Sequence, residues 1–165
     1  MKKLQNILIF LLLNVFAWAN SNLHFVPDYL ESTQNPFNSH TIKITSALLN
    51  EVDLELGDEI GVFDGDICVG AGIVEETLST NNMLEIPASA QNGDIPGFTS
   101  GNEISYRFWD ASSSSEIINI SASYLQGSGI FNQLSSSYVS LEAEFSNEYY
   151  MEITDGCDLP ESNIK

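Results

Sequence analysis

Acidic residues and glycines are concentrated in one short stretch of the chain, residues 57–72, which reads GDEIGVFDGDICVGAG. Three of its carboxylates, Asp58, Asp64 and Asp66, are hard oxygen ligands of the kind that Ca²⁺ binds. Asp64 and Asp66 flank a flexible glycine, although the full twelve-residue calcium loop with a terminal Glu is absent. One hypothesis is therefore a calcium site at these three residues, and Ca²⁺ is the only cofactor that the sequence suggests.

The same stretch also has the pattern of a hairpin turn. Its beginning, LGDEIGVFD at residues 56–64, is echoed by SGNEISYRFWD at residues 100–110, and the Asp-Gly-Asp motif keeps one carboxylate in the echo, Asp110. Glycine followed by Asp or Asn is typical of a turn that enters a strand, and Asp-Gly favours a hairpin whose glycine has positive φ. In this alternative Asp64 and Asp110 cap turns by bonding nearby amides, and Gly65 has a positive φ.

Residues for other chemistry are few. The two histidines, His24 and His40, precede the main apolar runs, so a Ser-His-Asp set has no well-placed base, and a zinc site needs more His or Cys. No helix pattern follows the glycines, which disfavours a phosphate-binding loop. Gly70 and Gly72 instead predict close packing or a bulge within a strand. We therefore expect no catalytic residues and no enzymatic activity.

The aromatic residues at 106–109 suggest a different kind of site. Tyr106 and Trp109 could form a platform on which the apolar face of an extracellular sugar stacks. In the alternative, Tyr106 and Phe108 share one strand face and belong to the core, and Trp109 covers its end. The echo also predicts that Phe63 and Trp109 project from equivalent faces. The platform hypothesis requires Trp109 to be exposed.

These candidate residues lie on a series of short predicted strands. Apolar and β-branched runs recur at short intervals, with Gly, Asn, Asp, Ser or Pro between them, which is typical of an all-β domain. No segment has a convincing amphipathic helix pattern. We expect an antiparallel β-sandwich of about seven strands. The predicted strands span residues 41–47, 59–63, 67–74, 83–86, 103–109, 116–122 and 138–145.

The beginning of the chain predicts export. Lys2 and Lys3 precede an apolar run at residues 7–18 that ends in Ala-Trp-Ala, as in a signal peptide cleaved after Ala19. The run is shorter than the roughly 20 residues that a membrane-spanning helix needs. We expect a protein that is extracellular or on the outer cell surface. The predicted parts are a signal peptide (1–19), an extended leader (20–40), a β-sandwich module (41–148), and an acidic tail or the start of a truncated following module (149–165).

The charge and the cysteines limit the partners and the covalent structure. The formal net charge is −18, which excludes nucleic acid and anionic membranes as partners because both need a basic surface. Such acidity either attracts cations or keeps an exported protein soluble. Cys68 lies in an apolar stretch and is predicted to be a buried small hydrophobic residue, whereas Cys157 lies in the acidic tail. Their number does not fix a pairing, and we expect two unpaired thiols.

The ordered motifs GDEIGVFDG, CVGA, GFxxGxxI and WD carry a family resemblance over residues 35–145. They resemble a β-rich accessory module of long exported bacterial proteins, often proteins that carry a type IX secretion sorting domain. The segment DGCDLPESN at residues 155–163 resembles the opening of a following module, and no sorting domain is present.

The resemblance implies a β-sandwich accessory module without catalytic residues to carry over. We expect a structural or adhesive role at the cell surface, next to neighbouring extracellular modules. Two alternatives remain, a module that binds extracellular glycans and a surface module stabilised by calcium.

Overall fold

The structure is a computed structural model that describes residues 23–144. The predicted signal peptide, the acidic tail and Cys157 lie outside these residues. The described part is an all-β sandwich, as the sequence predicts, and holds no helix long and apolar enough to cross a membrane. Its elements are η1 (Asp28–Glu31), β1 (His40–Leu49), β2 (Val52–Asp53), β3 (Glu59–Asp64), β4 (Ile67–Ile73), β5 (Leu84–Ala88), β6 (Ser105–Asp110), β7 (Ser115–Ile117), β8 (Ile120–Gln126) and β9 (Ser136–Ala143).

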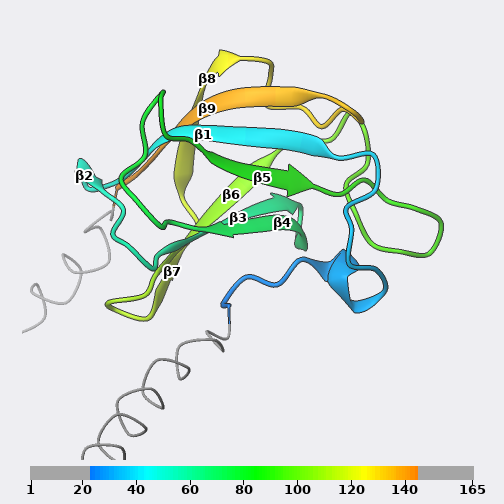
Figure 1. Ribbon diagram of the computed structural model, residues 1–165, viewed down its shortest axis with the longest axis horizontal. Coiled ribbons are helices and arrows are strands. Elements are labelled where there is room, and N and C mark those ends of the chain that lie inside the picture. Colours follow the sequence, from blue (N-terminus) through cyan, green and yellow to red (C-terminus); the bar gives the residue numbers. More distant parts are fainter. Residues whose placement is uncertain (1–22, 145–165) are drawn as a thin grey trace, which may run out of the picture.

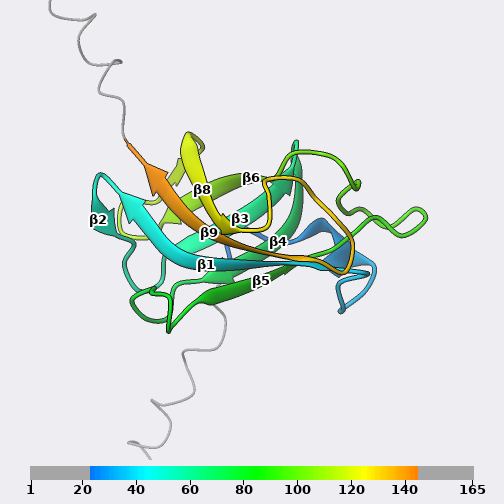
Figure 2. The same cartoon turned by 90° about the horizontal axis from the view of Figure 1, so that it is seen from above.

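The strands form two packed sheets (Figure 1). Sheet A has the order β2-β1-β9-β8, and β5 also pairs with β1. Sheet B has the order β4-β3-β6-β7. The prediction of a purely antiparallel sandwich was wrong at one place, because β1 and β9 pair in parallel. Figure 2 shows these two strands side by side with the same direction.

Two strand predictions also needed correction. The predicted strand 116–122 is two strands, β7 in sheet B and β8 in sheet A, and the chain changes sheets at residues 118–119. The short strand β2 was missed because its two residues are both exposed and carry no alternating pattern. The other six predicted strands correspond to observed ones, with ends that differ by at most two residues.

The main core fills the space between the two sheets. Alternation along β1 and β9 directs one face of sheet A inward, and Tyr106 and Phe108 do the same for β6 in sheet B. Gly70 and Gly72 allow β5 to pack closely on β4, since a Cβ at Gly70 would lie 2.9 Å from Ile86 Cγ2. The largest fully buried side chains include Phe98, Phe108, Phe131, Ile42, Ile44, Ile60, Ile86 and Leu141.

A second, smaller apolar cluster lies on the outer face of sheet B. Phe63 and Cys68 of the sheet pack there with Phe25, and Ala71 and Trp109 border them. Phe25 belongs to the leader, residues 23–39, which passes beneath sheet B in Figure 1 and contains η1. The leader is therefore packed against the sandwich, a contact that was not predicted from the sequence.

Candidate functional site

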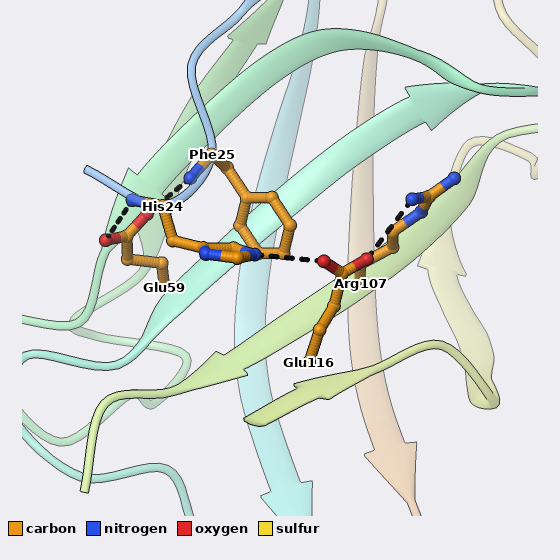
Figure 3. A network of polar contacts seen from close by, with 5 residues as sticks. All are labelled: His24, Phe25, Glu59, Arg107 and Glu116. Atoms are coloured by element: carbon orange, nitrogen blue, oxygen red, sulfur yellow. Dashed lines mark hydrogen bonds and ion pairs between the residues drawn. The ribbon is translucent and has the colours of Figure 1, made fainter. Parts of the chain in front are cut away.

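The most connected polar side chains lie where the leader meets sheet B (Figure 3). Glu59, the first residue of β3, is only 6% exposed. Its Oε1 accepts a hydrogen bond from the backbone N–H of His24 and its Oε2 accepts one from that of Phe25, both at 2.9 Å. Two N–H donors offset much of the cost of burying a carboxylate. Glu59 thus fixes the leader to the sheet through backbone groups.

The His24 side chain adds a second attachment. Its ring stacks on the indole of Trp109 at a centroid distance of 3.7 Å and an interplanar angle of 5°. Its Nε2 lies 2.9 Å from Oε2 of Glu116, whose Oε1 accepts a bond from Arg107 at 3.1 Å. The hydrogen bonds from His24 and then from Arg107 lower the pKa of Glu116. We call Glu59, His24, Phe25, Arg107 and Glu116 the leader latch.

Arg107 also joins the latch to the β3–β4 turn. Its guanidinium lies over the ring of Phe63, 4.1 Å from the ring centroid, and donates to Asp66 at 3.3 Å. A cation over an aromatic face is attracted by the ring quadrupole. The Asp66 side chain is fully exposed, so this ion pair contributes little stability.

The structure does not bring Asp58, Asp64 and Asp66 together into the predicted calcium site. Asp58 precedes β3 and Asp64 ends it, so about 20 Å of strand separates them. The Asp58 carboxylate is buried and accepts the backbone N–H of Glu55 at 2.8 Å and that of Ala111 at 3.0 Å. No group of three or more His, Cys, Asp or Glu side chains among residues 23–144 is placed to hold a metal ion.

The turn interpretation of the same residues is confirmed at several points. Gly65 has a φ of +61°, as an Asp-Gly hairpin requires. Asp110 caps its own turn, because its Oδ1 accepts the backbone N–H groups of Ser112 and Ser113. The hydroxyl of Ser112 and the N–H of Ser113 lower the pKa of Asp110.

Asp64 differs from the prediction. Its carboxylate does not bond a nearby amide but accepts the backbone N–H of Thr99 at 2.8 Å and the side-chain amide of Asn102 at 2.9 Å. It therefore ties the end of β3 to the loop that leads into β6. Sequence spacing alone could not show this contact, since 35 residues separate Asp64 from Thr99.

The predicted aromatic platform is divided between two faces. Tyr106 is only 4% exposed and its hydroxyl lies 2.9 Å from that of Tyr124, so its ring belongs to the core and cannot stack on a sugar. Burial raises the pKa of Tyr106 strongly. Trp109 projects from the same outer face as Phe63, as the echo predicts, and is half-buried with one ring face covered by His24.

A buried histidine and serine pair lies between β1 and β9. His40 and Ser137 are each 1% exposed, and His40 Nε2 lies 3.0 Å from Ser137 Oγ. His40 Nδ1 accepts the backbone N–H of Asn132, so Nε2 carries the proton and donates to the serine. Ser137 in turn donates to the carbonyl of Ser128. A nucleophilic serine needs the opposite direction of donation, so the pair joins strands and does not activate a hydroxyl.

Two further features of the described residues could take part in a reaction or bind a ligand. They are the Cys68 thiol and the hollows on the surface. Cys68 is buried, as predicted, and its thiol donates to the carbonyl of Gly70 at 3.6 Å. Burial raises the pKa of this thiol to about 12, which makes it a poor nucleophile. One surface hollow, of about 340 Å³, includes Glu75, Glu76 and Met83. The amide of Asn82 at its rim bonds the carbonyl of Thr77 within the same loop.

The latch was missed at the sequence level. Glu59 stood next to the predicted calcium residues, and the histidines were discounted because they lie near the leader. A usable signal was the set of apolar and aromatic residues within the predicted leader, of which Phe25 and Tyr29 are buried in the structure. No family model matches the chain, and no curated protein and no solved structure matches it significantly.

Proposed function

We propose that this chain is an exported, non-catalytic β-sandwich module with a structural or adhesive role outside the cell or on its surface. The observation that carries the proposal is that the ionisable side chains which could do chemistry form hydrogen bonds within the chain. Glu59, Asp58 and Asp64 each bond backbone N–H groups of a distant segment, and His40 bonds Ser137 on the neighbouring strand. Every buried polar side-chain atom of the described residues has a partner within the chain.

This use of polar groups suits a module that must keep its shape. A catalytic or ligand site keeps polar groups that converge on a space for the substrate. Here the same groups hold the leader, the turns and the strands together. The signal-peptide pattern of residues 1–19 and the resemblance to modules of exported bacterial proteins support the location.

The location can be tested with the full chain carrying a short epitope at Gly93, an exposed turn residue with a φ of +60°. Insertions at such turns are tolerated. Antibody added to intact cells should label the epitope, as it labels a known surface protein. Label that is reached only after the cells are lysed would contradict the proposal.

The non-catalytic role can be tested in cells that lack the chain. If deletion changes the cell surface or attachment, His24→Gln and Asp110→Asn should restore the original behaviour in proportion to the amount of folded protein. A folded variant that is present at the normal amount but fails to restore it would indicate a specific chemical role for that side chain.

A further inference from the structure

The first and last core strands of the sandwich form a long parallel seam with one bulge. β1 and β9 share eight registered residue pairs, from Thr41 opposite Ser136 to Leu49 opposite Ala143. Two further backbone bonds extend the seam, from Thr41 N–H to the Ser135 carbonyl at 2.9 Å and from Asn50 N–H to the Ala143 carbonyl at 2.8 Å. Figure 2 shows the two strands lying along one another over this length.

The direction of the strands decides how tension acts on this seam. The chain enters at the beginning of β1 and leaves at the end of β9, and in a parallel pair these two points lie at opposite ends. Tension between them slides one strand past the other, so the bonds of the seam carry the load together. Tension at adjacent ends would instead open the bonds one after another.

Side chains reinforce the seam at two points. At its beginning the buried His40 ring bonds Ser137 at 3.0 Å. Near its middle the register shifts by one residue between Ile44 and Ser46, and the hydroxyl of the bulged Thr45 donates to the Val139 carbonyl at 3.1 Å. A bulge normally interrupts a ladder, and here a buried side chain bridges the interruption.

The leader is attached differently. It joins sheet B through the two backbone bonds to Glu59, the stack of His24 on Trp109, and the buried rings of Phe25 and Tyr29. Tension on the leader loads these contacts in succession, starting at its first residues. The leader should therefore peel away before the seam yields.

We propose that the seam between β1 and β9 is a mechanical clamp that lets the module bear tension between its two ends, and that the leader latch is an earlier-yielding element in series with it. The inference rests on the proposed surface role, in which an extracellular structural or adhesive module transmits force between whatever is attached at its two ends. It extends that role by naming the load and the strands that resist it.

The test is single-molecule force spectroscopy on the full chain with Cys157→Ser, in which pairs of introduced cysteines carry the handles. Ser39→Cys with Glu144→Cys pulls across the seam, and Ser39→Cys with Ser135→Cys pulls at adjacent ends. Cys68 is buried and stays unlabelled. We expect a rupture force at least about twice as high in the first geometry, because forced unfolding follows the unfolding barrier along the pulled direction. Equal forces would overturn the clamp.

A matched pair of variants locates the load. Thr45→Val removes the bond to Val139 and should lower the rupture force across the seam. Thr41→Val makes the same change on the same strand, where the hydroxyl makes no hydrogen bond to a described residue of β9, and should leave the force unchanged. Rupture at adjacent ends corrects for any general loss of stability in Thr45→Val. An equal effect of both variants would contradict the assignment.

The attachment of the leader can be tested by the same force measurement. Moving the first handle to Leu23→Cys should add an early, weaker step of up to about 50 Å, the extended length of some 15 residues. Phe25→Ala should weaken this step and leave the main rupture unchanged. A single rupture without the early step would overturn the leader's part. A low rupture force across the seam would contradict the clamp and leave the proposed surface location unaffected. A chain found inside the cell would contradict the proposed location and leave the measured strength of the seam unaffected.

Discussion

The two copies of the glycine-acid turn, at residues 56–64 and 100–110, share a backbone and differ in the side chain that comes after the glycine. Gly57 and Gly101 both have a φ of +97°. Each glycine donates its backbone N–H at 2.9 Å to the carbonyl of a residue in another segment, Val74 for Gly57 and Phe131 for Gly101. That residue donates its own N–H back to the backbone carbonyl of the next residue, Asp58 or Asn102. The same short sequence pattern therefore has the same backbone conformation and the same pair of backbone bonds in both turns.

The two side chains form hydrogen bonds in opposite directions: one accepts and the other donates. Asp58 accepts the N–H of Ala111, just beyond the end of β6, whereas Asn102 donates to the carboxylate of Asp64, at the end of β3. Because β3 and β6 are antiparallel neighbours, each turn is joined to the end of the other copy's strand. The residue after the glycine therefore matches its partner: an acid stands where the partner donates, and an amide stands where the partner accepts.

Asp58→Asn should have the largest effect. The change removes one acceptor oxygen and points an amide donor at a backbone N–H in a buried place. Hydrogen bonds to charged groups contribute about 1.5–3 kcal/mol each, so we expect a loss of about 2–3 kcal/mol. Chemical denaturation at pH 7 measures it. A variant as stable as the parent would show that the carboxylate is replaceable.

Asn102→Asp tests the second turn, in which the side chain donates its hydrogen bond. The variant replaces a donor by a second carboxylate beside Asp64, so we expect a loss of about 1–2 kcal/mol at pH 7 from lost bonds and repulsion. Acid that protonates one of the carboxyl groups relieves the repulsion. The repulsion raises the folded-state pKa of the carboxyl pair above the ordinary Asp value of about 3.9. The deficit relative to the parent should therefore shrink as the pH falls from 7 toward about 4, and a deficit that stays constant with pH would argue against direct contact.

Glycine substitutions measure the shared backbone. Gly57→Ala and Gly101→Ala should each cost about 1 kcal/mol, because both positions have the same positive φ and no atom within 4 Å of an added Cβ. Gly65→Val should cost at least about 1 kcal/mol for the same reason. Thermal melts compare the three variants. Clearly unequal costs at Gly57 and Gly101 would show that the two turns are not equivalent.

Asp110→Asn should have the smallest effect, about 0.5 kcal/mol at pH 7, because its bonds to Ser112 and Ser113 are exposed. The folded-state pKa of Asp110 is lowered, so its contribution is present above the ordinary value of 3.8 and is lost as the pH falls through the folded value. The parent and the variant should therefore converge in stability below about pH 3. A difference that persists there would point to a cause other than the charge.

Local features of the fold could be predicted from the sequence, because neighbouring residues encode them. The positive φ of Gly65, the burial of Cys68 and the shared outer face of Phe63 and Trp109 follow from turn chemistry and strand alternation. Tyr106 fits the core alternative for the same reason.

Contacts between distant segments could not be predicted in this way. The parallel pairing of β1 with β9 joins strands about 90 residues apart, and their alternation is the same for either direction of pairing. The bonds from Glu59 to the leader and from Asp64 to Thr99 also depend on how these segments meet in space. A local acid pattern therefore suggested calcium at residues that the fold uses for backbone bonds.

A thermal melt of the full chain in EDTA and in millimolar Ca²⁺ at equal ionic strength tests the role of these carboxylates most directly. We expect the same midpoint in both, because the carboxylates of Asp58 and Asp64 are committed to N–H donors at opposite ends of β3. A ligand at a hundred times its dissociation constant stabilises by about 2.7 kcal/mol, which moves the midpoint by several degrees. A rise of that size in Ca²⁺, lost in Asp64→Asn, would contradict the structural role and restore the calcium site.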